Sequence, residues 1–231
     1  MEQEEGLRLL AEKGWLSATP ADFRQAILSR CSWERLKAGD PIQVGGEEQT
    51  ELIGVADGIV EMRSVLGRPD TPIMHLAHPV LWLGYGPIAF DRPRPTAASA
   101  RTPVSLARIP QAAVEKALSA RPEWWRHFIK PAIANGDMAL VAAADLLIRD
   151  NERRSAAVLL RLSGRRFAGP EDSKPVDVPI TQDELAGAAN LSRNSTGTML
   201  KRLEKRGLIE LGHRAKIVCF PAALRGFVEQ E

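Results

Sequence analysis

The sequence has little of what several large classes of protein require. Only two cysteines occur in 231 residues, Cys31 and Cys219, and they lie far apart. They offer neither metal-ligand spacing nor a disulfide framework, which is typical of a reducing cytoplasm. No apolar run is long enough to span a membrane, and the acidic start MEQEEGLRLLAEK lacks a secretion signal. We therefore expect a cytoplasmic protein that does not enter membranes.

Catalytic motifs and a strong net charge are also missing. The sequence contains no GxSxG, no Gly-rich phosphate loop with its lysine and no HExxH. The stretch LGYGPIAF has glycines, but no lysine and no expected helix start follow them. We therefore expect no enzymatic activity. Because the net charge is only +2, any surface that binds nucleic acid has to be local.

The N-terminal half alternates short apolar runs with turns. Helices are expected over residues 6–13 and from Thr19-Pro20 onward, because threonine caps a helix and proline fits its first position. The turns AGD, GGEE, ADG and GRPD then separate runs of strand length, which predicts a β-roll or barrel. The expected strands cover residues 52–55, 59–65, 73–76, 80–83 and 104–109.

A helical region follows these strands. Helices are expected over residues 111–118 and 122–129 and, after an interruption at Pro131, over residues 132–149. The last of these is apolar on two faces, so we expect one face to pack on its own domain and one on a second copy. One stripe runs through Ile133, Leu140, Ala144 and Leu147. The other, which we assign to the dimer interface, runs through Met138, Val141, Asp145 and Ile148.

Residues 180–219 carry the strongest local signals. Thr181 and Glu184 form a capping box, which starts one short helix. A turn at residues 190–192 follows, and Ser192 caps a second helix over residues 193–206. Asp150 is expected to cap an earlier helix over residues 152–162, and a short strand is expected over residues 176–178. Two capped helices joined by a short turn predict a helix-turn-helix, with residues 208–219 as a wing hairpin.

The second of these helices has the side chains that read DNA. Its N-terminal outer side presents arginine and asparagine, which pair with guanine and adenine. From residue 191 to 216 there are seven Lys and Arg against two Glu. A merely solvated basic helix pair is the alternative, as is a winged helix that contacts protein. The predicted DNA-binding residues are Thr181, Gln182, Ser192, Arg193, Asn194, Ser195, Thr198, Lys201, His213, Arg214 and Lys216.

With these residues in hand, the chain resembles the Crp/Fnr family of transcription regulators. TQDELAGAANLSRNSTGTMLKRLEKRGLIEL is similar to the family's helix-turn-helix and wing, and DNERRSAAVLLRLSGR to its helix after the hinge. AGD, GGEE and ADGIVEM, followed by LGYGPIAF, resemble its cyclic-nucleotide-binding-like roll. The resemblance implies a homodimer on palindromic double-stranded DNA. It also implies contact with RNA polymerase and a small-molecule effector in the roll.

The departures from the family concern the effector. Members that bind cyclic AMP use a Gly-Glu pair and an Arg-Ser pair, and on the dimer helix a Thr-Ser pair. Here Gly84 is followed by Tyr85, Thr96 is preceded by Pro95 with Arg94 one residue away, and Ala139-Leu140 replace Thr-Ser. Without the carboxylate and the arginine, polar groups of cyclic AMP stay poorly paired, so we expect no control by cyclic AMP. The candidate effector-pocket residues are Trp82, Gly84, Tyr85, Arg94, Thr96 and Leu140.

Other sensing chemistry finds little support. Cys31 alone cannot hold an iron–sulfur cluster. His75 and His78 are conceivable metal or haem ligands, although histidines three apart are more often surface or turn residues. Cys219 in the wing is expected to pack, with redox control as an alternative, so we expect no cofactor and no bound metal.

Together these features predict an α+β fold in three parts. Residues 1–130 form a double-stranded β-helix of the β-roll or jelly-roll type, with flanking helices, as a sensor domain. Residues 131–150 form a long dimerisation helix and hinge. Residues 151–231 form a winged helix-turn-helix. The expected function is a DNA-binding transcription regulator; the alternative is a ligand-, haem- or redox-responsive module whose winged helix contacts protein.

Overall fold

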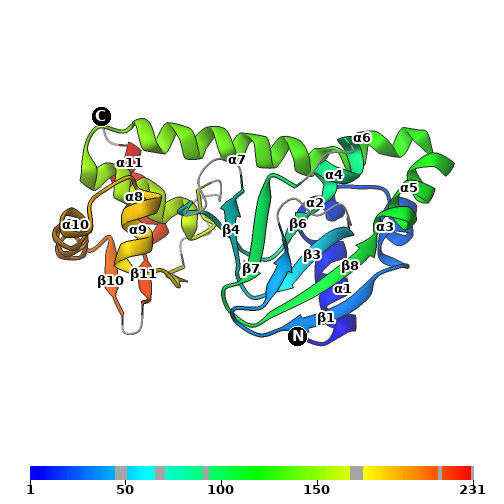
Figure 1. Ribbon diagram of the computed structural model, residues 1–231, viewed down its shortest axis with the longest axis horizontal. Coiled ribbons are helices and arrows are strands. Elements are labelled where there is room, and N and C mark those ends of the chain that lie inside the picture. Colours follow the sequence, from blue (N-terminus) through cyan, green and yellow to red (C-terminus); the bar gives the residue numbers. More distant parts are fainter. Residues whose placement is uncertain (45–50, 66–70, 91–93, 167–173, 213–214, 230–231) are drawn as a thin grey trace. The chain divides into compact units, whose positions relative to one another are not determined.

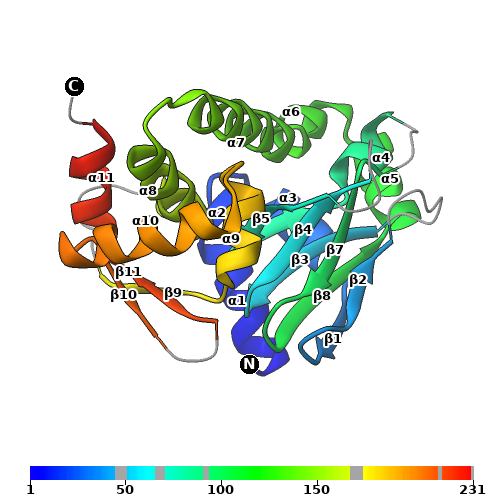
Figure 2. The same ribbon diagram turned by 60° about the vertical axis from the view of Figure 1, so that its left-hand side comes forward.

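The N-terminal half of the chain folds into two antiparallel sheets, shown in Figures 1 and 2. The computed structural model describes residues 1–44, 51–65, 71–90, 94–166, 174–212 and 215–229, so the expected turns GGEE and GRPD lie outside the described residues. The first sheet has the order β1 (Ser32–Leu36), β8 (Val104–Pro110), β3 (Glu51–Asp57), β6 (Leu81–Leu83). The second has the order β2 (Pro41–Gln43), β7 (Thr96–Ala100), β4 (Val60–Ser64), β5 (Ile73–Ala77).

Strand β3 explains how the roll is filled on both sides. Successive side chains of a strand point to opposite faces of the sheet. Ile53 and Val55 join a buried cluster to which both sheets contribute, including Val60 of the second sheet. Leu52 and Ala56, on the other face, join a cluster with the surrounding helices. The roll therefore has one apolar layer between its sheets and another beneath its helices.

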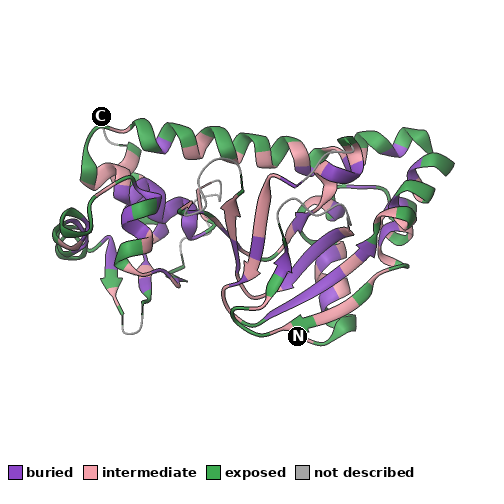
Figure 3. Cartoon of the chain, viewed as in Figure 1, coloured by how far each residue is buried: buried purple, intermediate pink, exposed green. Residues whose placement is uncertain are grey.

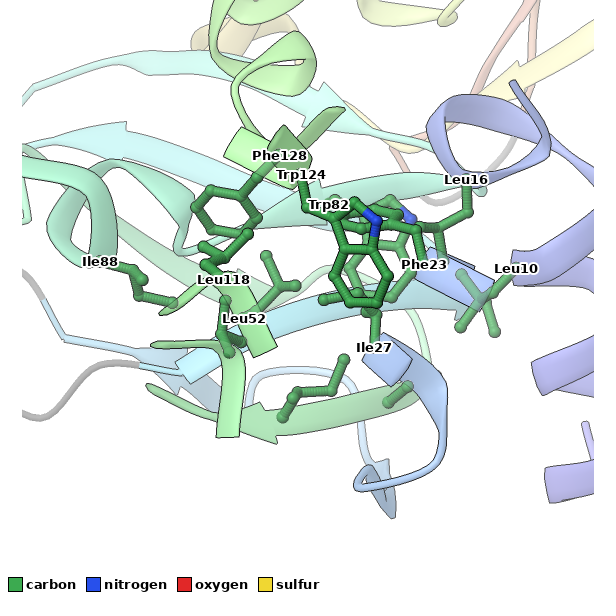
Figure 4. Packing of buried hydrophobic residues seen from close by; sticks show 14 residues of the cluster. Leu10, Leu16, Phe23, Ile27, Leu52, Trp82, Ile88, Leu118, Trp124 and Phe128 are labelled. Carbon is green, nitrogen blue, oxygen red and sulfur yellow. The ribbon is translucent and has the colours of Figure 1, made fainter. Parts of the chain in front are cut away.

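The helical layer is rich in aromatic residues (Figure 4). The ring of Trp15 packs edge-on against Trp82 and Phe23, with ring centroids 5.4 and 5.8 Å apart. A side chain at Gly54 of β3 would lie 2.9 Å from the ring of Trp82, so glycine makes room for the tryptophan there. The helices of this half are α1 (Gln3–Glu12), α2 (Gly14–Ser17), α3 (Ala21–Leu28), α4 (Tyr85–Phe90), α5 (Gln111–Ala120), η1 (Pro122–Trp124) and α6 (Trp125–Phe128).

Some sequence expectations for this half need correction. The structure adds three strands that the turn pattern did not delimit, β1, β2 and β7. Thr19 does not cap α3: its hydroxyl donates to the carbonyl of Leu16 at 2.6 Å, and Pro20 occupies the cap position. Pro131 lies within the first turn of α7 (Lys130–Leu147), where its missing N–H costs no helical hydrogen bond.

The C-terminal part matches its expected elements closely. Asp150 caps α8 (Asn151–Leu162), its Oδ1 accepting from the amide of Arg153 at 2.7 Å. A three-stranded sheet has the order β10 (Ile209–Leu211), β11 (Ile217–Cys219), β9 (Val176–Val178). The remaining helices are α9 (Gln182–Ala188), α10 (Arg193–Lys205) and α11 (Pro221–Glu229). The predicted α+β fold with its winged helix-turn-helix is thus confirmed.

The chain forms two compact units. The first, which we call the roll unit, comprises Met1–Pro69 and Ala77–Asp137; the second, the reading unit, comprises Asp70–Leu76 and Met138–Glu231. The division between the two units falls within α7, whereas the sequence analysis places the hinge at Asp150. The domain boundaries 1–130, 131–150 and 151–231 stay a prediction. All five tryptophans and the single tyrosine belong to the roll unit. No helix among the described residues has the length and apolar character needed to cross a membrane.

Much of helix α7 is exposed (Figure 3), and several of its exposed residues are large and apolar. Ile133, Leu140 and Leu147 recur every seven residues, and they are 60, 71 and 81% exposed. In the other stripe Asp145 is only 1% exposed, whereas Met138, Val141 and Ile148 are half-buried. The carboxylate of Asp145 is enclosed by its own chain, and the assignment of this stripe to a dimer interface stays a prediction.

Candidate nucleic-acid interface

The first helix of the helix-turn-helix starts at a complete capping box. The hydroxyl of Thr181 accepts from the amide of Glu184 at 3.1 Å, and the carboxylate of Glu184 accepts from the amide of Thr181 at 2.8 Å. These bonds satisfy amide groups that have no partner within the helix. The expected start of α9 is therefore confirmed, and the hydroxyl of Thr181 serves the helix cap.

A tight turn leads into the second helix. Asn190 adopts a left-handed conformation with φ of 52°, which asparagine tolerates better than most residues. The Oγ of Ser192 then accepts from the amide of Ser195 at 3.2 Å and shares a hydrogen bond with its hydroxyl at 2.8 Å. Both serines, predicted to bind DNA, thus form the N-terminal cap of α10.

Helix α10 separates an apolar inner face from a polar outer face. Thr196, Met199, Leu200 and Leu203 are buried. The predicted DNA-binding residues of this helix are all exposed, namely Arg193, Asn194, Ser195, Thr198 and Lys201. The helix therefore offers a side with hydrogen-bond donors, acceptors and positive charge.

Arg193 has an acidic neighbour on α9. Its Nε lies 2.9 Å from Oδ1 of Asp183, and both side chains are largely exposed. An exposed ion pair of this kind contributes little to stability, so it is easily exchanged for another partner. Gln182, also exposed, lies beside Gly197 of α10, where an added side chain would come within 3.4 Å of its Oε1.

The sequence reasoning missed the role of Glu152 at the start of α8. Its carboxylate accepts from Arg202 at 3.1 Å and from Arg206 at 3.2 Å. Arg202 lies in the C-terminal part of α10, and Arg206 occupies the C-terminal cap position of that helix. The pairing spans fifty residues of sequence, so no local pattern could reveal it.

The wing strands lie where the sequence placed them. Lys216, at the end of the hairpin tip, pairs with Asp177 of β9 at 2.6 Å. His213 and Arg214, predicted to contact DNA, lie outside the described residues. Cys219 is buried in β11, and this burial raises its pKa to about 12, which suits the expected packing role.

The candidate effector residues do not share one environment. Trp82 is 2% exposed and packs in the aromatic layer of the roll. Gly84 has φ of 89°, and a side chain there would meet the carbonyl oxygen of Glu51 at 1.9 Å, so the backbone itself requires glycine. Leu140 is an exposed residue of α7. Trp82 and Gly84 thus have structural roles in the roll without any ligand.

Three further candidates lie close to the ends of elements. Tyr85 begins α4, which shows that a helix does follow Gly84, contrary to expectation. Its hydroxyl accepts a hydrogen bond from Asn135 of α7. Burial raises the pKa of Tyr85, so its phenol stays neutral. Thr96 begins β7, and Arg94 just before it is buried.

In the part of the chain that the structure describes, no group of three or more His, Cys, Asp or Glu side chains is placed to hold a metal ion. His75 lies on β5 and His78 directly follows that strand. The expected absence of a cofactor stays a prediction.

These features define a winged helix-turn-helix protein, a class that binds DNA. Residues 153–227 match the model of the Crp-like helix-turn-helix domain. That part of the chain is therefore similar to the Crp-like helix-turn-helix domain, and the resemblance to Crp/Fnr regulators is confirmed. No curated protein matches the chain.

Solved structures extend the likeness to the whole fold. A CRP/FNR-family transcriptional regulator from Thermus thermophilus is 25% identical with a TM-score of 0.66, covering 86% of this chain and 99% of that one. A candidate cyclic nucleotide-binding protein from Ruegeria pomeroyi is 19% identical with a TM-score of 0.67, covering 100% of both. The c-di-GMP-responsive global regulator CLP of Xanthomonas campestris is 19% identical with a TM-score of 0.65, covering 87% and 99%. The chain thus has the fold of CRP/FNR-family transcription regulators.

Proposed function

We propose that this protein is a transcription regulator that binds a palindromic DNA operator as a homodimer and is not controlled by cyclic AMP. The observation that carries the proposal is the outer face of α10. There Arg193 and Asn194 stand exposed at the N-terminal end, where a recognition helix reaches base edges. Lys201 follows on the exposed side one turn beyond Thr198, within reach of phosphates.

The surface of α7 supports a homodimer. Ile133, Leu140 and Leu147 form an exposed apolar stripe with a spacing of seven residues, which is the repeat of a two-stranded coiled coil. Large apolar side chains in such a row are stabilised when a second copy covers them. A homodimer presents two copies of α10, and two-fold symmetry in the protein calls for a palindromic site in the DNA. RNA polymerase is the further partner that this proposal includes.

Tyr85 supports control by something other than cyclic AMP. It stands where family members that bind cyclic AMP have a glutamate, and it carries no negative charge at neutral pH because burial raises its pKa. Its hydroxyl is also engaged by Asn135. Gly84 is explained by the backbone alone. CLP, which shares the fold, responds to c-di-GMP, so a regulator of this shape is not tied to cyclic AMP.

The first test is selection of bound duplexes from a random DNA pool with the full-length protein. We expect an inverted repeat and an affinity that falls steeply with salt, because phosphate contacts release counterions. Light scattering measures the mass in parallel. Leu140→Glu is expected to give monomers that keep half-site preference, while Ala112→Glu, on the exposed side of α5, remains dimeric.

Four outcomes would contradict the proposal. Selected sequences without symmetry would remove the palindrome, and a dimeric Leu140→Glu variant would remove α7 as the interface. A thermal shift with cyclic AMP larger than that with c-di-GMP would overturn the statement on cyclic AMP. Salt-independent binding would favour protein contacts through the winged helix.

A further inference from the structure

The reading unit contains a buried cluster of charges whose role the proposed function does not explain. Asp145 of α7 and Arg161 of α8 are 1 and 3% exposed, and Nε of Arg161 donates to Oδ2 of Asp145 at 3.2 Å. Nη2 of Arg166 donates to Oδ1 of the same carboxylate at 3.3 Å. Burying opposite charges is costly and often gives no net stability. A geometric role therefore explains this cluster better than a stabilising one.

Arg161 joins three segments of the reading unit. Its Nε reaches α7, its backbone belongs to α8, and its Nη1 donates to the carbonyl of Met74 at 2.5 Å. Met74 lies in Asp70–Leu76, which belongs to the same compact unit. Burial lowers the pKa of Arg161, and the carboxylate of Asp145 counteracts this effect. One guanidinium thus holds the C-terminal half of α7 against α8.

Arg154, two turns earlier on α8, makes a second connection. Its Nη1 donates to the carbonyl of Ile148, just beyond α7, at 2.7 Å. Its Nε donates to the carbonyl of Ala189, at the end of α9, at 2.8 Å, and its Nη2 to Oδ1 of Asn151 at 2.6 Å. Carbonyls at helix C-termini attract cations, and a planar guanidinium with several donors can serve two of them. This residue connects the end of α7 with the turn before α10.

We propose that Arg154 and Arg161 are positioning residues that fix the DNA-reading helices on α7 and so determine the half-site spacing that the dimer accepts. In a dimer formed through α7, the separation of the two recognition helices depends on how each is held relative to that helix. The spacing of half-sites on DNA is a direct consequence of this geometry. The inference rests on the proposed homodimer and palindrome, which the same experiment checks first.

The test measures affinity for a series of duplexes with full-length protein by fluorescence anisotropy. Each duplex carries the two half-sites found by selection, with the spacer shortened or lengthened by one or two base pairs. The readout is the ratio between affinities for the best spacer and for its neighbours. Because all duplexes meet the same preparation, a partly unfolded variant lowers every affinity equally and leaves the ratio unchanged.

Two variants and one control are compared with the unmodified protein. Arg154→Met removes the connection to Ile148 and Ala189. Asp145→Leu with Arg161→Met removes the two most buried charges together, so that only the partly exposed Arg166 loses its carboxylate partner. Arg153→Met is the control on the same helix, because no side-chain hydrogen bond of Arg153 occurs among the residues that the structure describes.

We expect the unmodified protein and Arg153→Met to prefer one spacer by about tenfold, and both test variants to fall to within about threefold, with unchanged base preference in each half-site. Retention of the full ratio in both test variants would overturn the inference and assign the geometry to apolar packing of α8. If the unmodified protein has no preferred spacer or binds as a monomer, the proposed function fails as well, and the inference with it.

Discussion

The roll unit and the reading unit are stabilised in different ways. In the roll unit, partners far apart in sequence meet in apolar layers, as when Trp15 packs against Trp82. In the reading unit, an apolar core is supplemented by side chains that bind the backbone, as at Thr181 and Arg154. The aromatic layer of the roll unit therefore depends on volume and shape, and the helix-turn-helix of the reading unit also on direction and charge. Removal of volume should act strongly in that aromatic layer, and removal of a donor or acceptor should act at the helix-turn-helix.

The largest expected difference concerns the two cysteines, of which each unit has one. Burial raises the pKa of both thiols, and that of Cys219 to about 12. At neutral pH the thiolate of Cys219 is then about three orders of magnitude rarer than that of a free thiol. We expect iodoacetamide to modify Cys31 and to spare Cys219 in the native protein, as measured by mass spectrometry. Equal modification of both would contradict the burial of Cys219.

The same shift gives a pH dependence. Since the folded pKa of Cys219 lies above the unfolded value, its protonated form favours folding. This contribution is complete below about pH 8.5 and is lost as the pH rises toward 12. We expect Cys219→Ala to lose less stability than the unmodified protein over that alkaline range, measured by urea unfolding. If stability falls equally with pH in the two proteins, the raised pKa of Cys219 does not cause the pH dependence.

Removal of volume from the roll gives the next largest effect. Trp82→Ala leaves a cavity in the aromatic layer and is expected to lower the free energy of unfolding of the roll by about 3–5 kcal/mol. Urea unfolding followed by circular dichroism measures the loss. Trp125→Ala, at a position 39% exposed, is the control and should cost much less. Similar losses in both variants would show that burial does not decide the effect.

Removal of a donor from the reading unit acts on DNA binding. Arg193→Ala is expected to weaken specific binding by about 1–3 kcal/mol and to relax one base position, because arginine reads guanine by two hydrogen bonds. Competition binding with single-base variants of the operator measures both effects. Lys116→Ala, an exposed residue of α5, is the control for loss of one positive charge. An unchanged base preference would assign Arg193 to phosphate contact or to its ion pair with Asp183.

A smaller effect is expected at the capping box. Thr181→Ala removes the acceptor for the amide of Glu184 and should cost about 1 kcal/mol of the free energy of unfolding of the reading unit. Thr181→Ser keeps the acceptor and serves as the control. Thermal unfolding compares the two variants. If serine and alanine destabilise equally, the cap does not provide the stability.

The smallest effect is expected at Glu152. Glu152→Gln removes the charge that pairs with Arg202 and Arg206, which leaves both arginines more available to phosphates. We expect affinity for unrelated DNA to rise a few-fold and the salt dependence to steepen by about one counterion. Glu115→Gln on α5 changes the net charge equally and should have no effect. Binding isotherms over a range of salt would decide, and an unchanged slope would leave Glu152 a purely structural role.

The contrast between the units also explains what the sequence could predict. The starts of α8, α9 and α10 were predicted because each cap and its amide are three residues apart, as in Asp150 with Arg153. The strands of the roll pair over long distances, and Ser32 opposite Arg108 leaves no local trace. Thr19 was predicted as a cap because its residue type fits, yet its hydroxyl turns back to Leu16.

The candidate site was predictable to the same extent. The inner and outer faces of α10 follow from helical periodicity alone. The two stripes of α7 were visible too, but periodicity could not say which of them its own chain covers. Arg161 decides this by binding Asp145 from another helix. The ion pairs of Glu152 with Arg202 and Arg206 could not be predicted either, because only the folded chain brings α8 beside α10.

The distribution of tryptophan and tyrosine makes only the roll unit intrinsically fluorescent. Every tryptophan and the single tyrosine lie in the roll unit, so the reading unit contributes nothing to emission from these residues. In a titration, DNA is expected to bind the reading unit, which has no tryptophan or tyrosine, whereas the measured emission comes from the roll unit. A change in tryptophan emission at saturation then reports that the surroundings of the roll unit alter when DNA binds, without a dye or an added label.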